Sequence, residues 1–193
     1  TKARQTKYGL MITTLSFDLD DTLWDPRPAL IAADKAQWLA LARRYPDLAE
    51  RFTRDKIFVC RKQILTDAPS IAGDVTALRI EVMCRFLLSL DIASAEADES
   101  ARMAFEAFMA KRNDVILLPE TIPMLESVSE SYAVVAITNG NADVFKTEIG
   151  PYFDLSIRAD EAGIAKPDRG IFDLTWEKLG CQSSNVIHIG DSV

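Results

Sequence analysis

The amino-acid sequence predicts an α/β protein, a parallel sheet whose chain is interrupted by an inserted all-helical domain. Three observations support this prediction. Apolar and polar residues alternate near the N-terminus, which is typical of a strand. The stretch from Pro28 to Asn113 shows only helical spacing. After it, short runs that are apolar throughout alternate with helical segments, which indicates a parallel sheet covered on both faces.

The first predicted strand covers Ile12 to Leu19. Its polar positions recur at every second residue, so Asp18 and Asp20 project to one side and Asp21 to the other. Two prolines follow shortly afterwards and stop the extended segment, where a helix can begin. Three carboxylates therefore gather directly after an apolar strand.

The middle of the chain reads as a helical domain. Helical spacing predicts a helix around Leu30–Leu39 and helices over Val75–Leu90 and Ala97–Phe108, and a further helix is expected over Pro46–Leu65. Thr66–Asp74 reads as a loop between helices. We expect the aromatic residues at helical spacing to pack inside this domain, with stacking on a flat ligand as the alternative for one of them. These aromatic residues are Trp38, Phe86, Phe105 and Phe108.

The second half of the chain alternates helices with short apolar strands. The predicted elements are a helix over Ile122–Glu130, a strand over Tyr132–Thr138, a helix around Asp143–Ile149, a weak strand over Leu155–Ala159, a helix over Asp168–Leu179 and a strand over Asn185–Ile189. Asp168 caps its helix and Gly180 ends it. The sequence thus predicts a Rossmann-like core over residues 10–25 and 115–193, and a helical domain over residues 26–114.

Polar side chains follow four of the predicted strands. They are Asp18 and Asp20 after the first strand, Thr138 and Asn139 after the second, Lys166 in the loop after the third, and Asp191 after the fourth. Ligands of open parallel sheets bind beyond the carboxyl ends of the strands. We therefore expect these side chains to converge on one crevice.

The chemistry of this set favours phosphoryl transfer. Two carboxylates about 4 Å apart repel by roughly 4 kcal/mol at an effective dielectric constant near 20, so the cluster calls for a cation. Mg²⁺ prefers oxygen ligands and keeps waters that a phosphate can replace. The lysine, the threonine hydroxyl and the backbone amides of the TNGN segment can donate hydrogen bonds to phosphoryl oxygens. A carboxylate beside a bound phosphate can attack it and form an aspartyl phosphate.

Four motifs resemble those of a known family. They are DLDDT at 18–22, ITNGN at 137–141, KPD at 166–168 and IGDS at 189–192. In this order they resemble the motifs of the haloacid dehalogenase superfamily of hydrolases, and the helical insertion matches the cap domain of its first subfamily. The segments FDLDDTLWDPRP, DVTALR and VVAITNGNAD are similar to its bacterial flavin mononucleotide phosphatase-like members. The resemblance implies a Rossmann-like core with an inserted helical cap.

The resemblance implies that Asp18 is the nucleophile, and that Asp20 protonates the leaving oxygen and then activates water. Dehalogenases that this chain resembles lack an acid at the second position, because a halide leaves without a proton. Asp20 thus favours a phosphatase, and we expect a substrate such as flavin mononucleotide, a nucleotide or a sugar phosphate. A 2-haloacid dehalogenase-type hydrolase and a non-catalytic, receiver-like phospho-ligand module are the alternatives.

The resemblance also implies roles for the remaining strand-end residues. Thr138 and the amide of Asn139 would bind the phosphoryl group, and Lys166 would neutralise charge on the nucleophile and the phosphate. The implied Mg²⁺ ligands are Asp18, Asp20 through its backbone carbonyl, and Asp191. The family usually places a second acid a few residues after this last aspartate, whereas the sequence stops at Val193, so we expect the natural chain to continue.

The composition narrows the class of partner. The net charge of −7 and the pI near 4.8 argue against nucleic acid and anionic membranes as partners. The second half has no apolar run approaching the roughly 20 residues of a membrane-spanning helix. Three widely spaced cysteines suggest neither a disulfide framework nor a zinc site, which favours a reducing cytoplasm. We expect a cytoplasmic enzyme for a small phosphorylated molecule, and the oligomeric state stays open.

Some residues have a simpler structural interpretation. His188, the only histidine, lies inside an apolar strand, so we expect it to be a packed residue or a support for the site rather than a general base. Asp25 and Arg27 follow the nucleophile and are weaker candidates for facing the site. The leader TKARQTKYGLMITT has neither a long apolar segment nor a cleavage site, so we expect it not to be a secretory signal.

Overall fold

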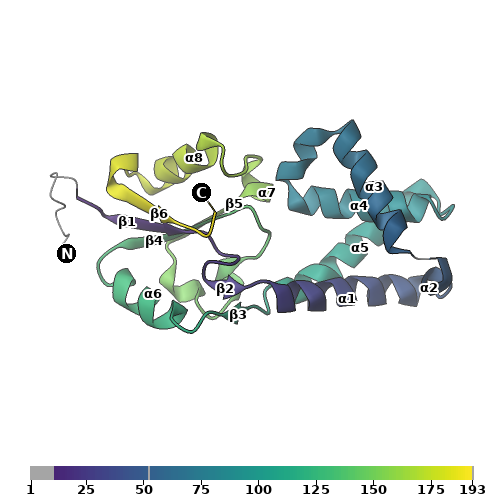
Figure 1. The fold of residues 1–193 in the computed structure, drawn as a ribbon, viewed down its shortest axis with the longest axis horizontal. Helices are drawn as coiled ribbons and strands as arrows, with labels where there is room; N and C mark the ends of the chain where they lie inside the picture. The colour runs from purple at the N-terminus through teal and green to yellow at the C-terminus, as the bar shows by residue number, and fades with distance from the viewer. Residues whose placement is uncertain (1–10, 52, 193) are drawn as a thin grey trace. The chain divides into compact units, whose positions relative to one another are not determined.

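The computed structural model describes residues 11–51 and 53–192 (Figure 1). The leader discussed above lies mostly outside these residues. The chain divides into two compact units. Ala29–Arg112 forms a helical unit, and the residues up to Pro28 together with those from Asn113 form an α/β unit. The sequence analysis placed the two boundaries at 25/26 and 114/115.

The α/β unit is built on a four-stranded parallel sheet with the strand order β5-β4-β1-β6. The strands are β1 (Thr14–Phe17), β4 (Ala133–Thr138), β5 (Leu155–Arg158) and β6 (Val186–Ile189). The first strand of the chain lies inside the sheet, because Phe17 pairs with Ala136 on one side and with Ile189 on the other. The predicted α/β fold with a parallel sheet is confirmed.

Helices lie on both faces of this sheet (Figure 1). They are α6 (Thr121–Ser129), α7 (Ala159–Ala162) and α8 (Arg169–Leu179). Leu125 of α6 shares a buried apolar cluster with Phe17, whereas Ile171 of α8 belongs to a second cluster with Ile137. Successive strand residues face opposite sides, so Ser16 lies on the face that α8 covers.

The ends of α8 follow the local signals in the sequence. The Asp168 carboxylate accepts a hydrogen bond from the Gly170 N–H over 2.7 Å, which caps the first turn. The helix ends at Gly180, whose φ of 66° is left-handed and suits a residue without a side chain. Both ends lie where the sequence predicted them. The Asp168 cap at the start of α8 also sets where the loop that carries Lys166 ends.

A short antiparallel ribbon pairs β2 (Trp24–Asp25) with β3 (Ile116–Leu117). The sequence analysis did not predict it, because two-residue strands are too short to show an alternating pattern. The Asp25 carboxylate accepts hydrogen bonds from the Arg27 side chain at 2.7 and 2.8 Å. This side-chain hydrogen bonding lowers the pKa of Asp25 and raises that of Arg27.

The helical unit contains α1 (Arg27–Arg44), α2 (Leu48–Arg51), α3 (Arg54–Asp67), α4 (Val75–Leu88) and α5 (Ser94–Arg112). Thr53 caps α3 by accepting from the Lys56 N–H, and Asp74 caps α4 by accepting from the Ala77 N–H. The first residues of α1 belong to the α/β unit, so this helix carries one of the two covalent connections between the units, and the other lies between Arg112 and Asn113.

Apolar side chains from α1, α3, α4 and α5 form the core of the helical unit. Phe86 is fully buried, and the Trp38 ring meets it edge-on with 5.7 Å between centroids. Phe105 and Phe108 stack with 6.1 Å between centroids. The prediction that these aromatic residues pack within the helical domain is confirmed.

The prediction of a helix around Asp143–Ile149 is wrong. The segment instead forms a 3₁₀ turn over Val144–Lys146, and a second 3₁₀ turn, Gly150–Tyr152, follows it. A Cβ at Gly150 would lie 2.9 Å from the Phe145 Cα, so the chain folds back too tightly for an α-helix. The apolar spacing that suggested a helix reflects burial of these turns against the sheet.

The helix predicted over Pro46–Leu65 is divided. It forms α2 and α3, with the capping residue Thr53 between them. The segment Thr66–Asp74, predicted as a loop, contains a 3₁₀ helix over Pro69–Gly73. Capping side chains and a proline, rather than apolar spacing, set these boundaries.

The cysteines Cys60, Cys84 and Cys181 are free thiols. Burial raises the pKa of Cys60 and of Cys84, which keeps both protonated near neutral pH. In residues 11–51 and 53–192, no helix combines the length and the apolar character needed to cross a bilayer.

Candidate active site

Asp18 is the first residue after β1, and its carboxylate is held from two sides. The Lys166 Nζ lies 2.8 Å from Oδ2, and the Leu19 N–H donates to Oδ1 over 2.8 Å. The Asp18 N–H donates to the Ile189 carbonyl, which extends the pairing of β1 and β6 by one residue. The side chains of Asp18 and Lys166 are 16% and 14% exposed, so the ion pair is largely withdrawn from water.

Asn139 fixes the backbone of Lys166 through a pair of hydrogen bonds. The Lys166 N–H donates to Asn139 Oδ1 over 2.7 Å, and Asn139 Nδ2 donates to the Lys166 carbonyl over 2.8 Å. Both ends of the amide are therefore used on one residue 27 positions away. We call this reciprocal pair the Asn139–Lys166 clamp, and it ties the lysine loop to the end of β4.

Asp20 lies two residues after the nucleophile candidate and is oriented by a tryptophan. The indole Nε1–H of Trp24 donates to Asp20 Oδ1 over 2.7 Å. Trp24 is fully buried, so the donor is fixed in place. The intervening turn contains Asp21 at φ 58° and closes through the Asp21 N–H, which donates to the Trp24 carbonyl. The sequence therefore turns sharply after β1 and presents Asp20 beside the strand end.

Thr138 is the last residue of β4, which lies next to β1. It is buried, and its Oγ1 accepts a hydrogen bond from the Gly140 N–H over 3.0 Å. This contact holds the TNGN turn at the carboxyl end of the strand. A hydroxyl that accepts one hydrogen bond still has a proton to donate.

Asp191 follows β6 by two residues. Its N–H donates to the Thr22 Oγ1 over 3.1 Å, which joins this segment to the turn after β1. The preceding residue approaches the nucleophile candidate, because a Cβ at Gly190 would lie 3.3 Å from the Asp18 Cβ. The exposed Asp191 therefore lies at the same edge of the sheet as Asp18.

The structure thus places the predicted residues at one edge of the sheet, with Asp18, Lys166 and Asn139 joined by direct contacts. Two features are absent from the sequence analysis. The clamp joins residues far apart in the chain, so local spacing contains no sign of it. The Trp24 contact with Asp20 spans four residues and depends on the left-handed turn, for which the aspartate-rich segment was the only sequence signal.

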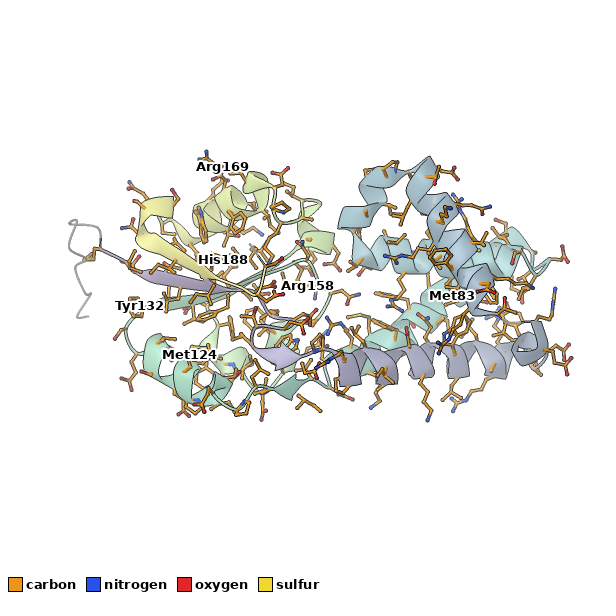
Figure 2. All side chains as sticks on the ribbon, viewed as in Figure 1. Met83, Met124, Tyr132, Arg158, Arg169 and His188 are labelled. Atoms are coloured by element: carbon orange, nitrogen blue, oxygen red, sulfur yellow. The ribbon has the colours of Figure 1, made fainter. Side chains whose placement is uncertain are left out.

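His188 lies on the face of the sheet that α8 covers (Figure 2). Its Nδ1 is 2.7 Å from the Ser16 Oγ, and its ring meets the Phe172 ring edge-on at 5.2 Å. Burial lowers the pKa of His188 below its ordinary value of 6.5, and the Lys166 charge lowers it further, whereas Asp18 acts in the opposite direction. The imidazole is therefore neutral near pH 7.

The oxygen donors at this edge suit a hard divalent cation. Within the part of the chain that the structure describes, no three His, Cys, Asp or Glu side chains lie close enough together to hold a metal. A bound Mg²⁺ would draw on the Asp18 and Asp191 carboxylates, the Asp20 backbone carbonyl, waters and phosphate oxygens. Such a set fits Mg²⁺, which usually binds proteins through one or two carboxylates and keeps several waters.

Comparison with curated proteins finds relatives from Escherichia coli. The chain is 30% identical over 182 residues to the 5-amino-6-(5-phospho-D-ribitylamino)uracil phosphatase YigB, an alignment that covers 94% of this chain and 76% of that protein. It is 31% identical over 94 residues to the pyrimidine 5'-nucleotidase YjjG, covering 45% of this chain and 42% of that protein. Both relatives are phosphatases.

A solved structure named as a 2-haloacid dehalogenase from Pseudomonas syringae pv. Tomato DC3000 has the same fold. Its TM-score is 0.87 at 35% sequence identity, covering 94% of this chain and 79% of that one. A family model for haloacid dehalogenase-like hydrolases matches residues 12–193, nearly the whole sequence. The chain therefore belongs to the haloacid dehalogenase-like hydrolase family.

Proposed function

We propose that the protein is a Mg²⁺-dependent phosphatase that hydrolyses a small phosphorylated metabolite through an aspartyl-phosphate intermediate. The observation that supports it most is the acid two residues after the nucleophile candidate. Asp20 is oriented by the indole of Trp24, and a phosphate ester needs such an acid because its alkoxide leaving group must be protonated.

In the first step, an Asp18 carboxylate oxygen attacks phosphorus and the bond from phosphorus to the ester oxygen breaks. Asp20 gives its proton to that departing oxygen, which leaves as an alcohol. Lys166, 2.8 Å from the Asp18 carboxylate, pairs with its negative charge before the attack and offsets charge on the phosphoryl oxygens during it.

In the second step, the now ionised Asp20 takes a proton from water. The water oxygen attacks phosphorus, the bond between phosphorus and Asp18 breaks, and inorganic phosphate leaves. Asp18 is again a carboxylate and Asp20 is again protonated, so the cycle closes with one water consumed. The Thr138 hydroxyl and the backbone N–H of Asn139 hold the phosphoryl oxygens in both steps.

Asp18, Asp191 and the backbone carbonyl of Asp20 would hold the Mg²⁺ ion. When bound, the ion offsets the negative charges of the carboxylates and of the phosphate, which otherwise repel one another. The Asn139–Lys166 clamp holds the backbone of Lys166, whose ammonium group balances negative charge and is not itself a metal ligand.

The names of the curated relatives suggest a substrate class. Each name describes a phosphate ester at position 5 of a ribityl chain or nucleotide, attached to a pyrimidine. We propose that this chain acts on a primary phosphate at the end of a five-carbon polyol or sugar that bears a nitrogen heterocycle. Flavin mononucleotide and pyrimidine nucleoside 5'-phosphates share this chemistry. A hexose 6-phosphate and a nucleoside 3'-phosphate are the matched contrasts, and a preference for either would contradict the proposed class.

The phosphatase assignment is tested by the dependence on leaving group. With Mg²⁺ present, Asp20→Asn should lower kcat on alkyl phosphates by about 10²- to 10⁴-fold, the usual contribution of general acid–base catalysis. The loss on p-nitrophenyl phosphate should be much smaller, because nitrophenolate leaves without a proton. Asp21→Asn is the control, since Asp21 is exposed and asparagine tolerates its left-handed φ. Equal losses on both substrates would remove Asp20 from the acid role.

A dehalogenase is the second candidate, supported by the name of the solved structure at 35% identity. In that reaction Asp18 would attack a carbon and displace a halide, and Asp20 would have no leaving group to protonate. Halide release from 2-chloropropionate that is insensitive to Asp20→Asn, together with no phosphate release from any ester, would favour this candidate. We expect phosphate release and no halide release.

We also propose that the protein acts in the cytoplasm on a small molecule, without nucleic acid or membrane partners. The free cysteines and the net charge of −7 support this proposal.

A further inference from the structure

Ser16 and His188 form a polar pair close to the nucleophile candidate, in which Ser16 is buried and His188 is partly buried. They face each other across β1 and β6 in register, and Ser16 Oγ lies 2.7 Å from His188 Nδ1. Ser16 is fully buried in the sheet, where its neighbours on β1 are apolar. A polar pair in such a position costs stability unless it is fully hydrogen-bonded, so its geometry is restricted.

Burial of Ser16 determines which nitrogen of His188 carries the proton. A buried hydroxyl must place its proton on an acceptor, and within the described residues His188 Nδ1 is the side-chain partner of Ser16 Oγ. Ser16 therefore donates and Nδ1 accepts. A neutral imidazole that accepts at Nδ1 carries its proton at Nε2, so the other edge of the ring is a hydrogen-bond donor.

The Nε2 edge of the ring and the Asp18 side chain both lie next to Gly190. The position of a Cβ on Gly190 would be 3.7 Å from His188 Nε2 and 3.3 Å from the Asp18 Cβ, so both border the space that this glycine leaves open. The Phe172 ring packs edge-on against the imidazole, with 5.2 Å between the ring centroids, and this packing helps to hold the ring in its orientation. The electrostatic influence of Asp18 and Lys166 on His188 is consistent with this proximity.

We propose that His188 is a positioning residue for the Asp18–Lys166 pair, acting as a neutral Nε2–H donor whose tautomer is fixed by Ser16. This inference rests on the proposed phosphatase function. The Nε2–H turns the positive end of its bond dipole toward the nucleophile and supports its carboxylate. Because the ring is neutral, it adds no second full charge that would compete with Lys166 for Asp18.

Two substitutions separate the donor from simple packing. An asparagine at 188 can replace Nδ1 as the acceptor for Ser16 but does not reach the Nε2 position, whereas a glutamine can place an amide N–H there. We expect His188→Asn to lower kcat about tenfold with KM within twofold, and His188→Gln to retain at least half of the wild-type kcat. Both proteins should unfold at similar urea concentrations. Equal kcat values for the two variants would overturn the proposal.

The tautomer can be observed independently of activity. His188 is the only histidine in the sequence, so its ¹⁵N ring resonances in the full chain need no assignment against others. At pH 7.5 we expect the shifts of a protonated Nε2 and an unprotonated Nδ1. In Ser16→Ala, which removes the donor to Nδ1, we expect the resonances to move toward a tautomer mixture and kcat to fall several-fold. A protonated Nδ1 in the wild type would refute the inference.

These results distinguish the inference from the proposed function. If Asp18→Asn abolishes phosphate release while His188→Asn retains full activity, the function stands and the positioning role is wrong. If Asp18→Asn keeps full activity, the proposed function fails, whatever tautomer is observed. Asp154→Asn is the control for a loss of carboxylate charge, because Asp154 contacts the Val134 N–H at the opposite end of β4.

Discussion

From the Asn139–Lys166 clamp we predict that the side-chain amide of Asn139 supports both the stability of the folded protein and its catalytic turnover. Asn139→Ala removes two hydrogen bonds, of 2.7 and 2.8 Å, and leaves the Lys166 N–H and carbonyl without these partners. A typical hydrogen bond contributes about 1 kcal/mol net, so the expected loss in unfolding free energy is about 2 kcal/mol. With a urea m-value of about 2 kcal/mol/M, the unfolding midpoint should fall by about 1 M.

The same substitution should reduce turnover more than binding. The clamp sets the position of Lys166, whose Nζ lies 2.8 Å from the Asp18 carboxylate. A displacement of about 1 Å in a reacting geometry can cost roughly 100-fold in rate. Steady-state phosphate release with Mg²⁺ should therefore show kcat lowered by about 10- to 100-fold, with KM changed much less.

A matched variant separates the two effects. Asn113 Oδ1 accepts one hydrogen bond, from the Asp143 N–H over 2.9 Å, in the same unit. Asn113→Ala should cost about 1 kcal/mol of stability and leave kcat unchanged. The reasoning is refuted if Asn139→Ala is no less stable than Asn113→Ala, or if it keeps the wild-type kcat.

Four further outcomes are expected. Gly190→Ala places a Cβ 3.3 Å from the Asp18 Cβ, so kcat should fall about tenfold while the urea midpoint changes little; an unchanged kcat would show that this space is not needed. Ser156→Ala removes a buried hydroxyl that has no hydrogen-bond partner in the described part of the chain, so the midpoint should stay or rise, by up to about 1 kcal/mol in free energy. Chelation by EDTA should stop phosphate release and added Mg²⁺ should restore it, whereas activity that persists without metal contradicts the proposed ion. Burial lowers the pKa of His188 below 6.5. The stability that the neutral ring contributes is therefore complete above pH 6.5 and is lost as the pH falls through the folded-state pKa. The urea midpoint of the wild type should decline just below pH 6.5, and this decline should be smaller in His188→Gln.

The fold class could be predicted because its signals are local. Strand β1 alternates, β4 is apolar throughout, and α8 has a capping aspartate and a terminal glycine, each readable within a few residues. The prediction of a helix over 143–149 was wrong because it also relied on local apolar spacing, and such spacing does not reveal a fold-back like the one at Gly150. The separate start of α3 after Thr53 was missed because a capping side chain, not apolar spacing, sets it.

The strand-end residues of the candidate site could be selected from the sequence because the carboxyl ends of parallel strands share one edge. How these residues are held could not. The clamp crosses from β4 to the loop before α8, and the Ser16–His188 pair joins strands 172 residues apart. Only the register of the folded sheet brings such partners together, so a single sequence without aligned relatives shows neither contact.

The position of β1 inside the sheet has a consequence for how the chain folds. Its neighbours pair Thr14 with Ala133 and with Val186, so both ladders close loops that contain the whole of Ala29–Arg112. Long-range pairing of this kind is slow, whereas contacts within a contiguous helical segment are local and quick. During synthesis on the ribosome the helical segment can therefore become compact before β1 has paired with β4 and β6. Asp18, the proposed nucleophile, would then be among the last groups to reach its final surroundings, after nearly all of the described chain has been made.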